Sequence, residues 1–304
     1  LDIRIVIANS ASEWDAAMAN DFFAALIQYP ASSGWVQDWS ADADKIHAKN
    51  AACIVAADLL ALTLLKPPGE WGADVVVGTT QRFGMPMCNG GPHAAYLACR
   101  DEFKRSMPGR LAGVSIDVHG NPAYRLALQT REQHIRREKA TSNICTAQVL
   151  PAVVASMYAV YHGPSGLTRI AQRVAAYTAI LAKGLAQLGY ARTHHGSAFD
   201  TLCLKTDAET QALVAQALAM GMNLRAAWDD YVIIALDETT TREDITKLWQ
   251  VFAKPEQKLP LVEDLESGIE PLIPAALRRD SAFLTHPVFN THHSETSMLR
   301  YIRR

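Results

Sequence analysis

The chain has 304 residues, of which 49% are hydrophobic, and its 29 Lys and Arg against 31 Asp and Glu give a formal net charge of -2. This composition is typical of a globular protein with one large domain or two smaller ones, and it excludes disorder, collagen and coiled coil. The slightly acidic balance provides no field that attracts nucleic acid or an anionic membrane, so we expect neither as a partner.

The cysteines and the hydropathy pattern indicate a soluble protein of a reducing compartment. Five scattered cysteines, an odd number, favour free thiols over a disulfide framework. No apolar run reaches the roughly 20 residues of a membrane helix, and the N-terminus has no signal-peptide pattern. The chain begins in a strand pattern and stops inside a helical one, which suggests a piece of a longer polypeptide.

The first hundred residues alternate between strand-like and helix-like patterns. A capped polar stretch at residues 40–48 suits a crossover helix, and residues 93–99 follow a tight turn and form a further strand candidate. Four more apolar runs of strand length lie at 3–8, 22–28, 53–57 and 74–78. Strand, helix, strand implies parallel pairing, so the pattern predicts an α/β sheet.

Beyond residue 142 the pattern predicts helices with short strands between them. Small and apolar residues over 143–161 predict a buried helix that ends at His162-Gly163-Pro164. The stretch Thr239-Thr240-Thr241-Arg242-Glu243-Asp244 is a capping-box signal at the start of the last helix, with a hydroxyl at the cap and a carboxylate three residues on. The expected elements are a long amphipathic helix at 166–188, strands at 202–205 and 232–236, and helices at 210–220 and 241–252.

These elements suggest four parts of the chain. They are an incomplete large α/β domain (1–142), a connecting buried helix (143–165), a small α+β domain (166–253) and a linker (254–304). Prolines and glycines among charged residues between 254 and 280 leave little apolar area to offset the entropy of ordering. We therefore expect that stretch to be an exposed connector.

No standard metal or nucleophile motif is present. Adjacent histidines, as in His194-His195 and His292-His293, point to opposite faces of a strand, and the spacing of Cys88, His93 and Cys99 matches no standard zinc site. The sequence has no Gly-x-Ser-x-Gly elbow and no local signature of a catalytic cysteine. We therefore predict no metal site and no hydrolase chemistry.

The densest polar segment, residues 131–139, runs directly into Ala140-Thr141-Ser142-Asn143 at the start of the predicted buried helix. Hydroxyls and free amides at a helix start bind anions, phosphate above all, when guanidinium groups are near. A solvated helix face is the alternative interpretation. A nucleic-acid site over Arg131 to Lys139 is a further alternative, against which the acidic balance and the lack of interleaved aromatics argue.

Several motifs together resemble the family of glycine decarboxylase, the P protein of the glycine cleavage system. They lie at residues 68–74, 80–86, 90–95, 104–110, 129–146, 283–290 and 293–296, so the resemblance covers nearly the whole chain. In that family two related halves of pyridoxal-phosphate fold type I lie in one polypeptide or two subunits. This chain resembles the later part of the N-terminal, non-catalytic half.

The resemblance implies an α/β fold that is a partial pyridoxal-phosphate fold type I. The expected structure is a three-layer αβα large-domain remnant with a mixed, mostly parallel sheet, followed by the small α+β domain. Residues 254–304 would then lead toward a missing C-terminal catalytic half.

The family reaction is the pyridoxal-phosphate-dependent decarboxylation of glycine, followed by aminomethyl transfer to the lipoyl group of H protein. The resemblance therefore implies three partners: the catalytic half of the same enzyme, lipoylated H protein, and glycine as substrate of the whole. It implies a cytoplasmic protein if the source is bacterial and a mitochondrial-matrix protein if it is eukaryotic. The alternative is an isolated subunit-assembly module without a catalytic role.

The resemblance also assigns site residues. Thr80-Gln81-Arg82-Phe83 matches the family's His-Lys-Thr-Phe stretch, so Gln81 stands at the Schiff-base lysine position, where a carboxamide cannot form the aldimine. Asp58 resembles the carboxylate that holds the pyridinium nitrogen, here vestigial. Thr141, Ser142 and Asn143 resemble a Gly-Thr-x-Asn element that reaches the partner half's cofactor phosphate.

We therefore expect no catalytic residue in this fragment, and an inactive chain that binds no pyridoxal phosphate by itself. The glycine-rich phosphate loop of a complete half is not in this sequence. A self-sufficient enzyme that uses another lysine, such as Lys66 or Lys139, remains an alternative.

Overall fold

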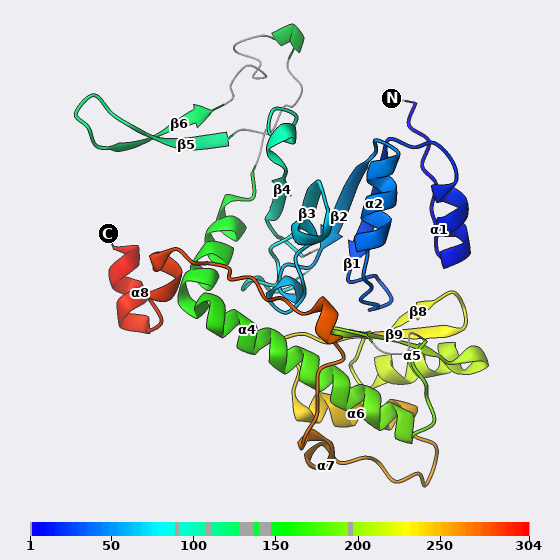
Figure 1. Cartoon of the computed structure of the whole chain (residues 1–304). Coiled ribbons are helices and arrows are strands. Elements are labelled where there is room, and N and C mark those ends of the chain that lie inside the picture. The colour runs from blue at the N-terminus through cyan, green and yellow to red at the C-terminus, as the bar shows by residue number, and fades with distance from the viewer. Residues whose placement is uncertain are drawn as a thin grey trace.

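A computed structural model of the chain describes residues 2–88, 91–107, 111–127, 137–139, 147–193 and 197–303, and Figure 1 shows how their elements are arranged. Within these residues, no helix is both long and apolar enough to cross a membrane. The same residues contain no group of three or more His, Cys, Asp or Glu side chains suited to a metal ion.

A four-stranded sheet forms the first half of the structure, in the order β1-β2-β3-β4. Its strands are β1 (Ala24–Tyr29), β2 (Ala52–Ala57), β3 (Val75–Thr79) and β4 (Ala95–Cys99). β1, β2 and β3 are parallel and β4 is antiparallel, which confirms the predicted mixed, mostly parallel sheet.

The crossover between β1 and β2 is α2 (Ser40–Ala48), as the polar stretch predicted. α2 buries Ala43 and Ile46 completely. In β2 every second side chain is buried, including Cys53 and Val55. Because side chains alternate between the faces of a strand, this pattern packs one face of the sheet into the core.

The prediction of a strand at residues 3–8 is wrong. These residues are not paired in any sheet, and Ile5 and Ile7 are 81% and 75% exposed. An apolar run becomes a strand only where another strand offers backbone partners. The next element is instead a helix, α1 (Ala11–Met18), where the Ser10 hydroxyl accepts a hydrogen bond from the Glu13 amide.

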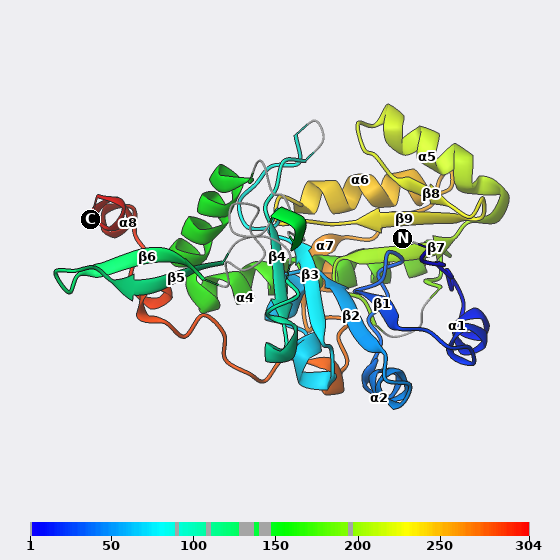
Figure 2. The same ribbon diagram turned by 90° about the horizontal axis from the view of Figure 1, so that it is seen from above.

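A β-hairpin that the sequence analysis missed follows the sheet. β5 (Leu111–Ile116) pairs with β6 (Pro122–Ala127), and the Asp117 carboxylate accepts the amides of His119 and Asn121 in the turn. Figure 2 shows the hairpin projecting away from both sheets.

One long helical segment, α4 (Val149–Gln187), links the two halves of the structure (Figure 1). It bends at Gly163, whose φ of 60° is non-helical, and at Pro164, where the sequence predicted a break. The part after the bend is deeply buried. The part before it is less buried than expected, because Val149 and Leu150 are 65% and 71% exposed.

A three-stranded antiparallel sheet, in the order β7-β9-β8, forms the second half. Its strands are β7 (Thr201–Lys205), β8 (Arg225–Ala227) and β9 (Tyr231–Ala235), with helices α5 (Thr210–Ala219) and α6 (Arg242–Phe252). The capping box predicted within residues 239–244 is confirmed, and its members are Thr241 and Asp244.

Residues 254–280 are not the exposed connector that their composition suggested. Val262 and Leu265 in α7 (Val262–Glu266), and Ile273 and Leu277 beyond it, are buried. The Lys66 amide donates to the Leu277 carbonyl at 2.8 Å. Apolar residues spaced between the prolines and glycines therefore pack this stretch onto the rest of the chain.

A last helix, α8 (Glu295–Ile302), lies near the first part of α4. Short 3-10 turns complete the structure: η1 (Ala61–Thr63), η2 (Pro68–Trp71), η3 (Asp101–Phe103), η5 (Arg137–Lys139), η6 (Asp207–Glu209), η7 (Ala275–Leu277) and η8 (Pro287–Asn290).

Candidate functional site

The carboxyl ends of β2 and β3 carry the two site residues that the structure describes. Asp58 directly follows β2, and Gln81 and Arg82 lie in the turn that follows β3. Because these strands are parallel, their carboxyl ends meet at one edge of the sheet. This is the edge at which open α/β sheets bind ligands.

Both oxygens of the Asp58 carboxylate accept hydrogen bonds from the protein itself. Its Oδ1 accepts the amides of Leu60 and Ala61 at 2.8 and 2.9 Å, which fixes the turn that leads into η1. Its Oδ2 accepts Nη1 of Arg82 at 2.9 Å. Oδ2 of Asp58 is therefore already paired with a guanidinium.

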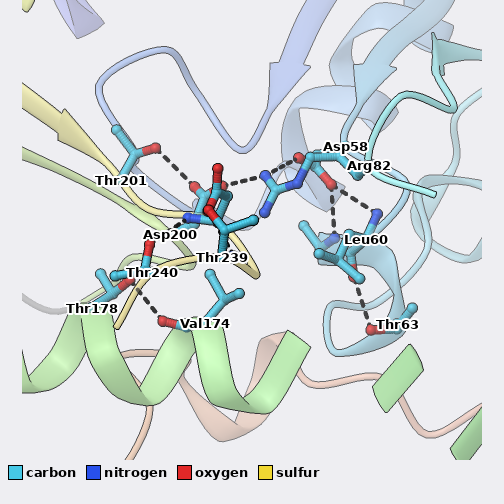
Figure 3. Close-up of polar contacts among 12 residues, drawn as sticks. Asp58, Leu60, Thr63, Arg82, Val174, Thr178, Asp200, Thr201, Thr239 and Thr240 are labelled. Carbon is cyan, nitrogen blue, oxygen red and sulfur yellow. Dashed lines mark hydrogen bonds and ion pairs between the residues drawn. The ribbon is translucent and has the colours of Figure 1, made fainter. Parts of the chain in front are cut away.

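Arg82 also reaches a second carboxylate, from the other half of the structure. Its Nη1 donates to Oδ2 of Asp200 at 2.5 Å, and Oδ1 of Asp200 accepts the hydroxyl of Thr201 at 2.8 Å. The guanidinium carbon lies 5.7 Å from the ring centre of Phe199. Figure 3 shows Arg82 between the two carboxylates.

This cluster is shielded from solvent. The side chains of Arg82 and Asp200 are 20% and 12% exposed. Burial alone would lower the pKa of Arg82, but Asp58 and Asp200 outweigh burial and raise that pKa above its ordinary value. Arg82 therefore carries its charge at any physiological pH.

Burial and the ion pair with Arg82 have opposite effects on the pKa of Asp200. Burial raises the pKa of Asp200, the nearby Asp58 carboxylate adds to the rise, and Arg82 only partly opposes it. Both carboxylates contact the same nitrogen of Arg82, so a second carboxylate gains less from the cation than one alone would.

Gln81 directly precedes Arg82 in the chain and offers no amine. Its backbone amide donates to the Thr79 hydroxyl at 3.1 Å, and its carbonyl accepts the Met85 amide at 3.1 Å. The turn is tied to β4 by the Thr80 hydroxyl, which donates to the Ala94 carbonyl at 2.9 Å. The primary carboxamide of Gln81 cannot condense with an aldehyde as a lysine amine does.

The residues at this edge do not fit pyridoxal phosphate. A covalent site needs an amine near the aldehyde and a free carboxylate near the ring nitrogen. Gln81, which the motif resemblance puts at the first position, is a carboxamide, and the carboxylate of Asp58 already accepts hydrogen bonds from Arg82 and two backbone amides.

Three other sequence-based site assignments lie outside the described residues. They are Thr141, Ser142 and Asn143, and the side chain of Lys139 is outside them as well. Of the two lysines in the self-sufficient alternative, Lys66 is described, and its backbone amide bonds to Leu277.

The sequence analysis missed the roles of Arg82 and Asp200. Arg82 did carry a signal, because an arginine stands where the family's catalytic motif has a threonine. Asp200 carried none, because it lies 118 residues from Arg82 and only the folded chain joins them.

Comparisons with known proteins agree with this architecture. The solved structure of a glycine decarboxylase P-protein, in inhibitor-bound form, superposes with a TM-score of 0.68 at 32% identity over 75% of this chain and 54% of that one.

More distant solved structures share the fold alone. A cysteine desulfurase from Thermococcus onnurineus NA1 has a TM-score of 0.54 at 13% identity, over 79% of this chain and 61% of its own. A serine palmitoyltransferase from S. paucimobilis with a bound pyridoxal-phosphate–myriocin aldimine has a TM-score of 0.51 at 12% identity, over 80% and 58%. These are fold type I enzymes, and the α/β fold with its mixed, mostly parallel sheet belongs to that class.

The sequence comparisons are more specific. Glycine dehydrogenases (decarboxylating) from Variovorax paradoxus (strain S110) and Paraburkholderia xenovorans (strain LB400) are 67% and 60% identical over 94% and 95% of this chain. The chain spans only 29% and 30% of their lengths. The family model of the glycine cleavage system P-protein matches residues 1–252. The chain therefore belongs to the glycine cleavage system P-protein family.

Proposed function

We propose that the chain is the later part of the non-catalytic half of glycine dehydrogenase (decarboxylating). The whole enzyme would decarboxylate glycine with pyridoxal phosphate and pass the aminomethyl group to the lipoyl group of H protein. The family membership and the identity to relatives of that name support this proposal.

The observation that carries the non-catalytic role is a glutamine, Gln81, directly before Arg82, whose guanidinium already pairs with Asp58. Without the amine no Schiff base forms, and without a free carboxylate the ring nitrogen has no counter-charge. We propose that residues 1–142 and 166–253 are the large and small domains of this half, joined by residues 143–165.

The role of this half would be to assemble with the catalytic half and complete its cofactor site. The exposed face of the hairpin supports an assembly role: Val114 pairs with Tyr124 and Ile116 with Pro122, and Val114, Ile116 and Tyr124 are 73–85% exposed. A two-stranded ribbon with one apolar face is marginally stable alone, and such a face marks an interaction site. We assign this face to the catalytic half.

The first experiment tests the non-catalytic role. The purified chain is titrated with pyridoxal phosphate, reduced with borohydride and weighed intact by mass spectrometry. We expect no aldimine absorbance and no stoichiometric phosphopyridoxyl adduct. A single adduct on one lysine, Lys66 included, would contradict the proposal and favour a self-sufficient enzyme.

The second experiment tests assembly through the hairpin. Tyr124→Asp places a charge on the exposed apolar face, and Ser115→Asp places the same charge on the opposite face of the hairpin. We expect Tyr124→Asp alone to weaken association of this chain with the catalytic half, measured by analytical ultracentrifugation. Equal effects of the two variants would show that this face is not the contact.

The third experiment tests the contribution of Thr141 to the neighbouring cofactor site. A hydroxyl bonded to a charged group contributes about 1.5 to 3 kcal/mol, and about 1.4 kcal/mol is tenfold in affinity. In an enzyme reconstituted from both halves, Thr141→Val should therefore weaken pyridoxal-phosphate retention by roughly ten- to a hundredfold. Unchanged retention with a lower melting temperature would favour the alternative of an assembly module without a catalytic role.

A further inference from the structure

A short segment before β7 is tied to the carboxyl edge of the four-stranded sheet. The Ser197 hydroxyl donates to the Val36 carbonyl at 2.6 Å, and Ala198 forms an isolated antiparallel bridge with Trp35. Both partners lie in the loop that follows β1. The contact at Gly34 is so close that a Cβ there would lie 2.0 Å from the Thr201 carbonyl oxygen.

Arg82 attaches the same segment at a second point. It comes from the loop after β3 and joins Asp58, after β2, to Asp200, which directly precedes β7. Residues 197–201 are therefore held to the loops after β1, β2 and β3, along the edge where open α/β sheets bind ligands.

Asp200 also belongs to the three-stranded sheet. Its carbonyl accepts the amide of Leu236, the residue after β9, at 2.9 Å. On the other side, the Asp58 carboxylate holds the amides of Leu60 and Ala61. Through Asp58 and Asp200, the guanidinium of Arg82 therefore connects the turn after β2 to the end of the three-stranded sheet.

We propose that Arg82 is an internal lock that holds the four-stranded and three-stranded sheets in one closed arrangement at the edge where a ligand would bind. The guanidinium stands between the carboxylates of Asp58 and Asp200, and this half becomes a fixed platform instead of a site that opens for substrate. The lock depends on Arg82, whereas the proposed non-catalytic role depends on Gln81. A failed test of one proposal therefore leaves the other unaffected.

The charges explain why the lock depends on the cation. Without Arg82, the carboxyl groups of Asp58 and Asp200 would face each other in a shielded position with no counter-ion, so they would have to move apart or one of them would have to take up a proton. Without the charge of Asp200, Arg82 would still be paired with Asp58, and an asparagine would still offer it an amide oxygen. Loss of Arg82 should therefore loosen the contact between the two sheets. Loss of the Asp200 charge in the same variant should reduce that effect, because only one carboxylate is then left without a cation.

The test is amide hydrogen exchange measured on the whole chain. Arg82→Met keeps the aliphatic stem and removes the charge. Removal of one partner of a buried ion pair costs enough to shift an equilibrium on the order of a hundredfold. We expect exchange at Leu60, Ala61 and Leu236 to rise by about that factor. The amides in the middle of the β7–β9 ladder should change less, because the loss of Arg82 acts at the end of the ladder next to Asp200.

Three further variants complete the test. Arg82→Lys keeps a cation where only one nitrogen bonds the carboxylates, so it should retain most of the protection. In an Asp200→Asn background, Arg82→Met should have a much smaller effect. Arg242→Met, which breaks an exposed pair with Glu266, is the matched control and should leave all three amides unchanged.

Two results would overturn the lock. One is an effect of Arg82→Met confined to Leu60 and Ala61, which would mean that Arg82 supports only its own turn. The other is an equal effect with and without the Asp200 charge. If Arg82→Met does not fold, exchange at the same three amides is compared between Arg82→Lys and the Arg82→Met/Asp200→Asn double variant. We expect Arg82→Lys to keep its protection. Loss of protection in Arg82→Lys would contradict the lock.

Discussion

Trp249 of α6 packs directly against Gly184 of α4. A Cβ at Gly184 would lie 2.2 Å from Cε2 of the indole, and the indole Nε1 donates to the Leu181 carbonyl at 3.2 Å. Trp249 is completely buried, so it has no space to move away. Gly184 is therefore a point of close approach between α4 and α6.

Gly184→Ala should destabilise the protein. The added methyl must displace a buried indole, and overpacking of a core costs typically about 1–3 kcal/mol. Urea denaturation should show a lower free energy of unfolding. Gly69→Ala is the matched control, because a Cβ there meets nothing within 4 Å. Equal stability of the two variants would show that the α4–α6 contact is not tight.

Thr241→Ala should remove the cap of α6. The Thr241 hydroxyl accepts the Asp244 amide at 3.2 Å, and the Asp244 carboxylate accepts the Thr241 amide at 2.9 Å. Loss of such a cap costs about 1 kcal/mol. The free energy of unfolding should fall by about that amount, while Thr246→Ala, further along the same helix, should change it less. A larger loss for Thr246→Ala would contradict the capping role.

The pH dependence of stability should report the raised pKa of Asp200. Because burial raises that pKa in the folded chain, the folded state binds this proton more readily than the unfolded state. The contribution of Asp200 to the free energy of unfolding must then fall as pH rises from about 4, the ordinary carboxylate value, through the raised pKa.

Asp200→Asn removes this titration. The free energy of unfolding of the unchanged chain minus that of the variant should decrease as pH rises from about 4 to about 7, measured by urea denaturation. A difference that increases with pH would mean that the ion pair with Arg82 outweighs burial and lowers the pKa of Asp200.

Cysteine labelling should separate Cys53 from Cys88. Burial raises the pKa of the Cys53 thiol to about 11, and the nearby Asp74 carboxylate adds to this effect. Cys88 is exposed. Because the thiolate is the reactive form, a maleimide at neutral pH should label Cys88 and spare Cys53 in the folded chain. Peptide mapping by mass spectrometry checks this; rapid labelling of Cys53 would contradict its burial.

The sequence predicted those parts of the fold that depend on local pattern. Apolar runs located β1, β2 and β3, and the capping-box signal located α6. The same reasoning was wrong at residues 3–8, because pairing depends on a neighbouring strand. It missed the β5–β6 hairpin, whose strands mix apolar residues with Gly113, Ser115 and Arg125.

For the candidate site, the motif resemblance located Gln81 and Asp58 at the carboxyl edge of the sheet, and the structure places them in the loops after β3 and β2. It did not indicate that Asp58 is paired with Arg82, or that Asp200 takes part. These two contacts span 24 and 118 residues of sequence, and no local pattern contains them.

The proposal that this chain is non-catalytic can be tested by locating the lysine that holds the cofactor. The enzyme assembled from this chain and the catalytic half is loaded with pyridoxal phosphate, reduced with borohydride and digested, and the phosphopyridoxyl peptide is sequenced by mass spectrometry. We expect one modified lysine, located in the catalytic half, and none in this chain. A stoichiometric adduct on Lys66 or on any other lysine of this chain would contradict it.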